Sequence, residues 1–464
     1  MSIEASSTGR GGAEGQLIGE RVRPRSAGYM IGSALVLGIA LFCMLLFIFL
    51  FLRRKPDSGT RIWVLNHTPD QVVIYNPHDG VAEKKFQVAD GLRGLTFSRD
   101  GASAYIFNVV DVVNKFTKVD TATYLKQESV EVDGVPQGIG TFPDDREVAV
   151  ITGSKTTGEA GGFDVLSMVE RSTADPTKPR RMWRVRDLQI THKIAVSDSG
   201  DRIYLLDAKS EYLTIYDYIN QTVDKEINLH GAAEQFLYPR AGDYYYISVL
   251  QHNAIYQFSK KDDAITGAYI YSYADPEKSF HNIKLRYMDI DSEGRYLFAT
   301  CYEAKSVAIW ELGNPDFARE AKDVIMPVGP EQKGYVWSDV TYYLPALRFG
   351  LKGGYSERLN YIAGGERIAV DPAGAFLALN DDEGAVYVYE LFEVMKTLRR
   401  RDPVPEIAPP TRNLPVLEPH LIITDLVRTG SGDVEIRDLQ IARPRVRRQG
   451  AATETAEDLQ AWNH

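Results

Sequence analysis

The chain has 464 residues, of which 44% are hydrophobic and 25% charged, and its formal net charge is −10. This near-average composition excludes a disordered or collagen-like chain, and the acidic balance argues against general nucleic-acid binding. Aromatic residues reach 11%, with 26 Tyr and 18 Phe, beside 38 Gly. Because aromatic residues favour strands and glycine favours tight turns, the composition predicts an all-β fold.

The first segment that stands out along the chain is an uncharged run of residues 30–52. As a helix it would extend about 34 Å, enough to cross a hydrocarbon core of about 30 Å. It is longer than the apolar region of a cleaved signal peptide, and it is followed by Arg53, Arg54 and Lys55. We therefore expect a tail over residues 1–29 and then one uncleaved transmembrane helix over residues 30–52.

Small residues lie in the first half of this run. Ala34 and Gly38 have the small-xxx-small spacing that lets a second helix approach closely. Gly32 lies two residues before Ala34. Gly and Ala are also frequent in membrane helices in general, which is the alternative explanation. Gly32, Ala34 and Gly38 are our candidate helix-contact residues.

From residue 60 onward the chain repeats a strand, a turn of the form apolar-[Ser/Pro/Asp]-x-x-Gly, and a second strand. Six copies of the turn occur, at 97–101, 142–146, 196–200, 238–242, 290–294 and 370–374. Five of them end in glycine, as a hairpin turn with positive φ requires. Arg146 ends the second copy, so that turn is expected to differ from the others or to carry strain.

Further apolar strands follow the copies, giving four antiparallel strands per unit, which is the blade of a β-propeller. The interval from 290 to 370 is long enough for one blade with an insertion or for an irregular extra blade. The unit over 61–88 lacks its first strand, so the two strand-poor ends are expected to meet and close the ring. We expect about seven four-stranded blades over residues 60–391, with six or eight as alternatives.

Two copies, GLTFSRDGASAYIFN from Gly94 and KIAVSDSGDRIYLLD from Lys193, resemble the repeats of YVTN-type and WD40-like bacterial β-propellers. The resemblance covers residues 61–390, but the glycine-histidine and tryptophan-aspartate marks of true WD40 repeats are absent. It implies a membrane-anchored bacterial propeller. It implies no particular activity, because propellers serve as enzymes, binding platforms and scaffolds.

Residues 392–464 have a different composition and are expected to form an extended C-terminal arm. Its first part, 401–419, is rich in proline and polyproline-like. Residues 421–442 alternate apolar and polar around a Gly-Ser-Gly turn, which predicts a β-hairpin. This hairpin either closes the propeller or adds a pair of strands to a partner, and the length of the arm is our main indication that a partner exists.

The sequence contains no recognisable site for chemistry. Cys43 and Cys301 are the two cysteines, and they are placed too differently to form a disulfide. The eight histidines show no metal-binding pair, and no phosphate loop, dinucleotide fingerprint or nucleophile elbow occurs. We therefore predict no catalytic, cofactor or metal site, although a site assembled from distant loops escapes a linear search.

Three basic clusters lie in this acidic chain, within 178–186, 399–401 and 443–448. They are candidates for contact with anionic lipid headgroups or an acidic partner, each basic residue contributing about 1 kcal/mol near such a surface. The alternative is a solvated edge strand whose charges prevent sheet-to-sheet association. The candidate residues are Arg180, Arg181, Trp183, Arg184, Arg186, Arg399, Arg400, Arg401, Arg445, Arg447 and Arg448.

These features predict a non-catalytic, single-pass membrane protein that acts as a scaffold or accessory subunit of a larger membrane complex, a respiratory or photosynthetic assembly being one example. Its expected partners are other membrane-protein subunits, contacted through the transmembrane helix, the propeller rim and the C-terminal arm, and anionic lipid headgroups. The alternatives are a propeller enzyme or a small-ligand sensor using the central channel, and a factor for envelope protein assembly.

The expected location is the plasma (inner) membrane of a bacterium. Basic residues flank both ends of the apolar run, so the positive-inside rule favours a cytoplasmic C-terminal part only slightly. A signal anchor with a short inside tail and a large translocated domain is the commoner arrangement. On that ground we expect the propeller on the periplasmic side.

Overall fold

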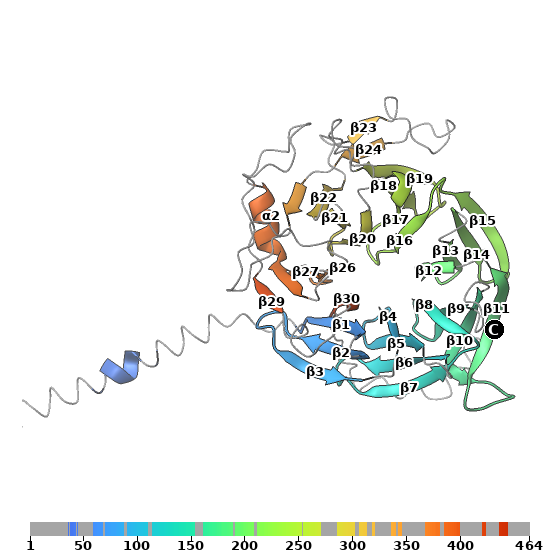
Figure 1. The fold of residues 1–464 in the computed structure, drawn as a ribbon, viewed down its shortest axis with the longest axis horizontal. Coiled ribbons are helices and arrows are strands. Elements are labelled where there is room, and N and C mark those ends of the chain that lie inside the picture. Colours follow the sequence, from blue (N-terminus) through green and yellow to red (C-terminus); the bar gives the residue numbers. More distant parts are fainter. Residues whose placement is uncertain are drawn as a thin grey trace, which may run out of the picture. The chain divides into compact units, whose positions relative to one another are not determined.

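Seven β-sheets surround a common axis in the larger of two units of the chain, residues 58–464, in this computed structural model (Figure 1). The smaller unit comprises residues 1–57. The structure describes residues 36, 38–42, 44, 59–67, 70–87, 91–109, 114–153, 161–188, 191–207, 211–252, 254–270, 285–301, 306–312, 318–320, 336–339, 342–345, 367–380, 385–399, 420–423 and 436–443.

The expected membrane segment is described only at residues 36, 38–42 and 44, which are helical. Val36 and Phe42 have exposed apolar side chains, and no atom lies within 4 Å of the place where Gly38 would carry a Cβ. The remainder of 30–52, including Gly32 and Ala34, lies outside the described residues. In the described part of the chain, no helix is long and apolar enough to span a bilayer.

The first blade is built from both ends of the ring-forming chain. Its sheet has the order β3-β2-β1-β30, and β30 pairs antiparallel with β1 so that Ile62 lies opposite Ile441. Its strands are β1 (Arg61–His67), β2 (Asp70–Tyr75), β3 (Ala82–Phe86) and β30 (Ile436–Ala442). The missing first strand of this unit therefore comes from the C-terminal arm, and the ring closes as expected.

Blades 2, 3 and 4 are regular four-stranded antiparallel sheets. Blade 2 contains β4 (Leu92–Phe97), β5 (Ser103–Val109), β6 (Asn114–Asp120) and β7 (Lys126–Glu131). Blade 3 contains β8 (Val135–Thr141), β9 (Glu147–Gly153), β10 (Gly161–Arg171) and β11 (Pro179–Leu188). Blade 4 contains β12 (Thr191–Val196), β13 (Arg202–Asp207), β14 (Tyr212–Asp217) and β15 (Thr222–Asn228).

Blades 5 and 6 share one long insertion. Blade 5 has six strands, in the order β16 (Ala233–Leu237), β17 (Tyr244–Val249), β18 (Ala254–Ser259), β19 (Ile265–Ile270), β24 (Val336–Asp339) and β23 (Ala318–Glu320), with the short 3-10 helix η1 (Leu250–His252) after β17. Blade 6 contains β20 (Leu285–Ile290), β21 (Tyr296–Cys301), β22 (Ser306–Glu311) and β25 (Tyr342–Pro345). The long interval after residue 290 thus holds one blade with an insertion.

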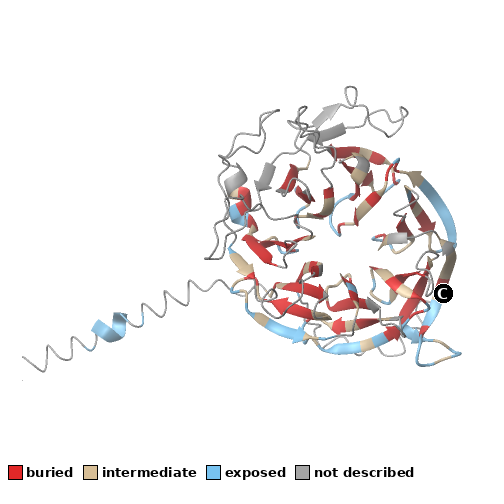
Figure 2. Ribbon diagram, in the orientation of Figure 1, coloured by how far each residue is buried: buried red, intermediate tan, exposed pale blue. Residues whose placement is uncertain are grey.

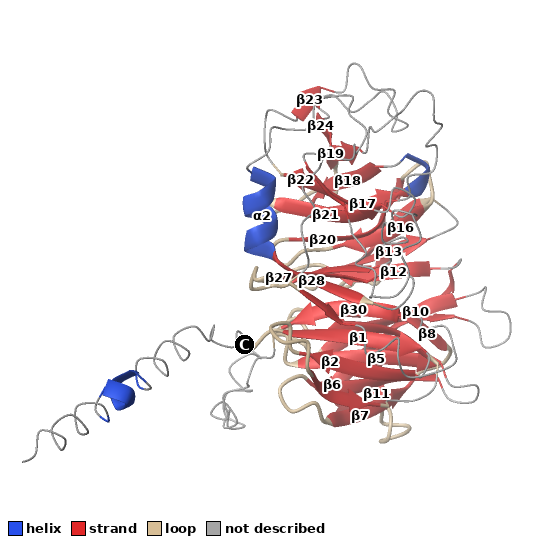
Figure 3. Ribbon diagram, turned by 60° about the vertical axis from the view of Figure 1, so that its left-hand side comes forward, coloured by secondary structure: helices blue, strands red, loops and turns tan. Residues whose placement is uncertain are grey.

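Blade 7 corrects the predicted C-terminal hairpin. It contains β26 (Arg367–Val370), β27 (Phe376–Asn380), β28 (Val386–Glu390) and β29 (Leu421–Ile423), whereas β30 belongs to blade 1. The hairpin prediction over 421–442 is therefore wrong: the two strands enter neighbouring sheets, because blade 7 lacks an outer strand and blade 1 an inner one. The helix α2 (Leu391–Arg399) precedes β29 and packs against β27 and β28 (Figure 3).

The apolar core lies between the blades. Each of the seven buried clusters joins two neighbouring sheets; for example, Tyr105 and Phe116 of blade 2 pack with Val148 and Val150 of blade 3. The outer strands β3, β7 and β15 are mostly exposed and polar (Figure 2). Their charged side chains protect these sheet edges from pairing with other strands.

The repeated turns also join neighbouring blades. In the five turns that end in glycine, this residue has positive φ, 76° at Gly101 and 78° at Gly200. A Cβ at Gly200 would lie 3.2 Å from Cδ of Pro143 in the turn of the preceding blade. Glycine is therefore favoured here both by backbone conformation and by the close approach of the next turn.

The turn of blade 3 differs, as Arg146 suggested. Its left-handed residue is Asp145, with φ 56°. The Asp145 carboxylate accepts hydrogen bonds from the backbone N–H groups of Arg99 (2.6 Å) and Asp100 (3.0 Å) in the turn of blade 2. Asp tolerates this conformation better than most residues, and here its side chain joins the two blades.

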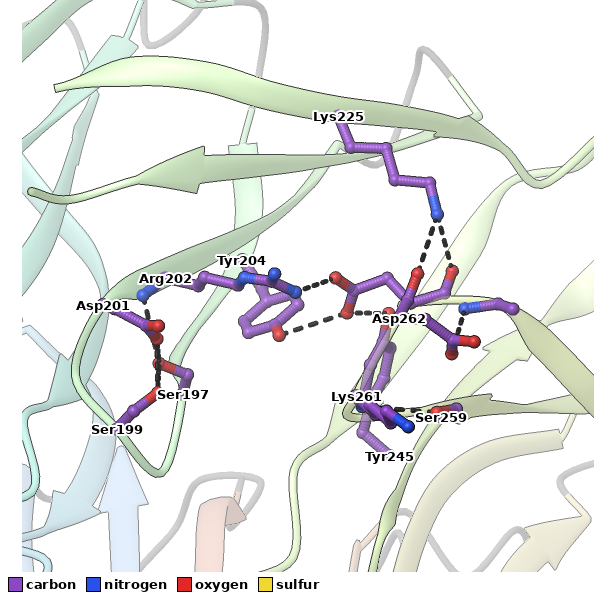
Figure 4. Close-up of polar contacts among 12 residues, drawn as sticks. Ser197, Ser199, Asp201, Arg202, Tyr204, Lys225, Tyr245, Ser259, Lys261 and Asp262 are labelled. Atoms are coloured by element: carbon purple, nitrogen blue, oxygen red, sulfur yellow. Dashed lines mark hydrogen bonds and ion pairs between the residues drawn. The ribbon is translucent and has the colours of Figure 1, made fainter. Parts of the chain in front are cut away.

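A buried polar network joins blades 4 and 5 (Figure 4). Asp263, in the turn between β18 and β19, accepts hydrogen bonds from the hydroxyl groups of Tyr204 and Tyr245, each 3.2 Å away. Arg202 forms an ion pair with the same carboxylate, 2.5 Å away. Burial raises the pKa of Asp263, and Arg202 is the largest opposing influence. The network places one carboxylate where three donors from two blades meet it.

We predict that truncation before β30 destroys the ring, whereas truncation just after it does not. A chain ending at Asp425 loses the buried Ile436, Leu439 and Ile441, which together contribute about 5 kcal/mol, and leaves the inner edge of β1 unpaired. A chain ending at Pro444 keeps all three. Urea unfolding of both purified chains measures the difference, and equal midpoints would contradict this mode of closure.

Candidate ligand site in the central channel

The inner strands carry one extra residue near their start. On β4, Leu92 pairs with Asn108 and Gly94 with Phe107, so Arg93 is the additional residue of a β-bulge. The same irregularity occurs on β8, β12, β16, β20 and β30. Bulges re-aim side chains and recur beside functional sites. Here they set a common register for the residues that follow them.

On these six inner strands, the residues that follow the bulge occupy equivalent places around the axis, and Arg367 holds the corresponding place at the start of β26, which has no described bulge. Five of these side chains are polar, and we call them the channel ring: Lys193, Gln235, Tyr287, Arg367 and Asp438, from blades 4, 5, 6, 7 and 1. All five line a cavity of about 1000 Å³ that is bordered by the inner strands. The other two equivalent residues, Gly94 and Gly138, have no side chain.

Apolar residues line this cavity beside the two glycines. A Cβ on Gly94 would lie 2.2 Å from Cζ of Phe107, so the Phe107 ring occupies the place that a side chain would take. Phe107 itself lines the cavity, beside Leu95 and Ile139. These apolar residues lie on the same side as the polar Gln137 of blade 3, which also lines the cavity.

Asp438 has a structural role at the point of ring closure. Its carboxylate accepts hydrogen bonds from the backbone N–H groups of Leu95 (3.0 Å) and Leu439 (2.9 Å). Gln440 donates a hydrogen bond through Nε2 to the Leu95 carbonyl, 2.9 Å away. Burial raises the pKa of Asp438, and Arg367 opposes this effect most. Both side chains tie β30 of blade 1 to β4 of blade 2.

Lys193 and Arg367 form the cationic part of the ring. Lys193 makes no hydrogen bond or ion pair with any residue that the structure describes. Desolvation lowers the pKa of Lys193, and the charge of Arg367 lowers it further. The charges of Asp438 and Glu234 act in the opposite direction and raise it. The Arg367 guanidinium carbon lies 3.9 Å from the centroid of the Tyr287 ring, a cation–π contact. These groups act on one another electrostatically across the channel.

Two polar atoms of the ring are buried without a hydrogen-bond partner among the described residues. They are Nε of Arg367 and Oε1 of Gln235. Buried polar groups are normally paired, because an unpaired group forfeits its hydration. Together with Lys193, they make the channel ring a place where the described groups of the protein do not complete the polar interactions.

A second axis-facing level contains Asp289, two residues after Tyr287. Its carboxylate accepts hydrogen bonds from the backbone N–H groups of Val370 (2.7 Å) and Ile290 (2.9 Å), so it joins blade 6 to blade 7. Burial raises the pKa of Asp289 to about 6, while these two hydrogen bonds lower it. Asp289 and Asp438 thus perform the same structural task at different junctions.

The turn end of the channel is spanned by side chains from three blades. Arg240 of blade 5 donates a hydrogen bond to the Ser98 carbonyl of blade 2, 2.8 Å away. Arg99 forms an ion pair with Asp198 of blade 4. Lys260 also pairs with Asp198, at 2.7 Å. Desolvation and then the charge of Arg99 lower the pKa of Lys260 to about 8.

The basic run predicted as an interaction surface is largely paired within blade 3. It lies on the outer strand β11. Arg184, Arg186 and Arg181 surround Asp164 of β10, at 2.7 Å, 3.0 Å and 3.2 Å, and the Asp164 side chain is 2% exposed. This arrangement supports the edge-strand alternative for these three arginines.

The neighbours of this cluster follow the same pattern. Arg181 and Arg184 also pair with Asp133, at 2.7 Å and 2.5 Å, and Arg180 pairs with Glu170 at 2.5 Å. Trp183 is buried and its ring meets Phe163 edge-on at 5.0 Å. Trp183 is therefore a core residue, and the arginines retain partial exposure at the rim.

Of the other basic candidates, the structure describes only one. Arg399 is the last residue of α2. The remaining basic candidates lie outside the described residues: Arg400, Arg401, Arg445, Arg447 and Arg448.

The channel ring was not predicted from the sequence, although the repeats contain a pattern that indicates it. The inner strands Lys193-Ile-Ala-Val196 and Arg367-Ile-Ala-Val370 begin with a cation before an apolar run, and Asp438 holds the equivalent place in β30. A charged residue recurring at one register position of repeats that otherwise bury apolar side chains points to the axis of the ring.

Several solved structures share this fold. The chain is similar to hydrazine synthase from Kuenenia stuttgartiensis (13% identity, TM-score 0.49, covering 72% of this chain and 93% of that chain). It is similar to the Swd1 β-propeller domain from Myceliophteria thermophila (13%, 0.48, 71% and 92%) and to a functionally unknown protein from Desulfotomaculum acetoxidans (10%, 0.50, 72% and 92%). At these identities the similarity concerns the fold alone. In sequence, the chain matches no protein-family model and no curated protein.

We predict that Asp164→Ala destabilises the protein by about 2 kcal/mol, because it leaves three partly buried arginines without their shared carboxylate. Asp133→Ala, which removes a 54% exposed carboxylate from the same cluster, should cost about 0.5 kcal/mol. Urea unfolding of both variants measures this difference. A neutral Asp164→Ala would show that the arginines do not depend on this pairing.

Asp289→Asn should change how stability depends on pH. Between about pH 4 and pH 6, native Asp289 holds a proton that the unfolded chain has lost, so its stabilising contribution disappears as the pH rises through about 6. The asparagine side chain does not titrate, so the variant does not lose stability in this way. The free energy of unfolding of the variant minus that of wild type should therefore be about 2 kcal/mol larger at pH 7 than at pH 4.

Urea unfolding at several pH values measures this gain. Asp243→Asn, at an exposed position in a neighbouring turn, is the control and should run parallel to wild type. A pH-independent difference between Asp289→Asn and wild type would contradict the burial of this carboxyl group.

Proposed function

We propose that the protein is a non-catalytic, membrane-anchored β-propeller that serves as a scaffold or accessory subunit of a larger membrane complex. The observation that supports this best is the outward extension of blade 5. Between β22 and β25 the chain leaves blade 6, adds β24 parallel to β19, and adds β23 beyond it. This excursion enlarges the rim at one place.

Ring closure does not require the extension. β22 and β25 pair directly and antiparallel, with Ile309 opposite Tyr342, so a short turn could connect them. The outer strands of blades 1, 2 and 4 end in exposed charged edges instead. The extension is therefore not needed for the ring, yet it pairs with the outer strand of blade 5. Its strand edge can pair with the backbone of a partner protein.

The apolar segment at 30–52 supplies the proposed anchor. Eight residues separate it from Arg61, the first residue of β1, so the proposed linker is short. Anionic headgroups and neighbouring transmembrane subunits are the proposed partners. We place the ring on the periplasmic side of a bacterial inner membrane.

A small-ligand sensor is the second candidate function. The channel ring favours it, because Lys193 and Arg367 lie in a cavity without complete partners. An enzyme would need a group that reacts with the ligand in the same cavity, and a sensor needs only binding. A sensor and a scaffold are compatible roles for one ring, so the two proposals can be tested separately.

We predict that the full chain, purified from native membranes in mild detergent, co-purifies with integral membrane subunits. Replacing residues 313–341 by a short Gly-Ser turn should leave the melting temperature within about 3 °C, because β22 and β25 still pair, while removing those subunits. Differential scanning calorimetry measures the melting temperature, and mass spectrometry of the purified material identifies the subunits that remain. A matched shortening of residues 154–160, between β9 and β10, is the control.

The outcome for the full chain decides the proposal. A full-length protein that runs as a lone monomer would contradict the subunit role. Retention of every partner by the 313–341 variant would contradict the placement of docking at blade 5.

A further inference from the structure

We propose that the central channel binds a small organic oxyanion, whose carboxylate or phosphate group lies between Lys193 of blade 4 and Arg367 of blade 7. The cavity of about 1000 Å³ that these residues line provides the space. Volumes of this size hold cofactors and metabolites in other proteins. The inference does not depend on the scaffold role, because it concerns the axis of the ring and not its rim.

The charge around the channel favours an anion. Five of the residues that line the cavity are cationic, against four carboxylates; the cations are Arg99, Lys193, Arg240, Arg367 and Arg443, and the carboxylates are Asp100, Asp289, Asp291 and Asp438. The chain as a whole has a net charge of −10. A locally positive channel with low-dielectric walls concentrates anions from solution, and this one lies within an acidic protein.

The carboxylates of Asp438 and Glu234 do not complete the cationic pair. Asp438 is engaged by the backbone N–H groups of Leu95 and Leu439, and no ion pair connects Lys193 or Arg367 to any described carboxylate. Two neighbouring cations repel one another and lose hydration, and Asp438 and Glu234 offset this only partly, without a contact ion pair to Lys193. An oxyanion between them supplies the missing negative charge, and a guanidinium binds such groups well.

Apolar side chains in the lining indicate an organic ligand. Phe107, which fills the place beside Gly94, lines the cavity together with Leu95 and Ile139. Tyr287 and Gln235 add a hydroxyl and an amide. A ligand with one anionic group and a compact apolar body therefore fits the channel better than inorganic phosphate does.

Binding of such a ligand would also strengthen the ring. Lys193 and Arg367 belong to non-adjacent blades, 4 and 7, and the neighbouring Asp438 belongs to β30, which closes blade 1. A ligand that contacts both cations would connect two blades that are not neighbours in the ring. Because a ligand that binds only the folded state stabilises it, occupancy should raise the melting temperature of the whole ring.

The test uses the purified full-length chain in detergent, titrated calorimetrically with four probes. The probes are phenyl phosphate, benzoate, inorganic phosphate and neutral benzyl alcohol. We expect saturable binding of phenyl phosphate or benzoate, at least tenfold tighter than of inorganic phosphate and of the alcohol. Absence of saturable binding by both aryl anions, or equal affinity for the alcohol, overturns the proposal.

Substitutions place the binding in the channel. Lys193→Met and Arg367→Met should each weaken the aryl anion at least tenfold, whereas Lys193→Arg should stay within about threefold. Lys84→Met, on the exposed edge strand β3, is the matched control and should bind as wild type. Affinity that survives in both channel variants overturns the assignment.

The unliganded variants separate binding from a structural role. Lys193→Met removes a desolvated cation that has no described partner, so its melting temperature without ligand should equal or exceed that of wild type. A lowered melting temperature in Lys193→Met, with unchanged ligand-induced stabilisation, would assign Lys193 to folding and overturn its role in binding. If Arg367→Met does not fold, Arg367→Lys is used and should weaken the aryl anion.

Discussion

A ring of sheets has two free strand edges until its first and last blades are joined. In this chain the join is made by β30, which pairs with β1 from Arg61 opposite Ala442 to Asn66 opposite Ile436. Thr60, just before β1, also donates a hydrogen bond to Asp371 of blade 7. β30 contributes Ile436, Leu439 and Ile441 to the core between blades 7 and 1, and Ala442 to the core between blades 1 and 2.

Closure also completes the channel. β30 contributes Asp438 to the channel ring, and the same residue holds the neighbouring strand β4 through the Leu95 N–H group. The end of the chain therefore determines both whether the ring is closed and which groups face its axis. Stability and the proposed ligand site are coupled through one strand, so a change in β30 is expected to affect both.

Much of the fold could be predicted from the sequence, because the repeat is local. The strand-turn-strand pattern revealed the blades, and the incomplete unit at 61–88 revealed that the ends must meet. The hairpin over 421–442 was predicted wrongly, since pairing between distant segments leaves no local mark. Arg146 indicated an unusual turn, but the contact of Asp145 with Arg99 and Asp100 depends on two blades meeting.

The candidate site was harder to predict for the same reason. Lys193 and Arg367 lie 174 residues apart in the sequence, and Arg367 and Asp438 lie 71 residues apart. They converge only once seven strands share one axis. The basic run on β11 was easy to recognise in the sequence, but its pairing with Asp164 was not. Asp164 is a single acidic residue in the preceding strand, and nothing in the charge pattern distinguishes it.

Hydrogen exchange of the intact protein tests ring closure most directly. The account predicts that backbone amides of 436–442 exchange as slowly as those of 61–67, and that both segments lose protection together as denaturant is added. Rapid exchange of 436–442, while 61–67 remains protected, would contradict the account, because the ring would then be closed by something other than the C-terminal strand.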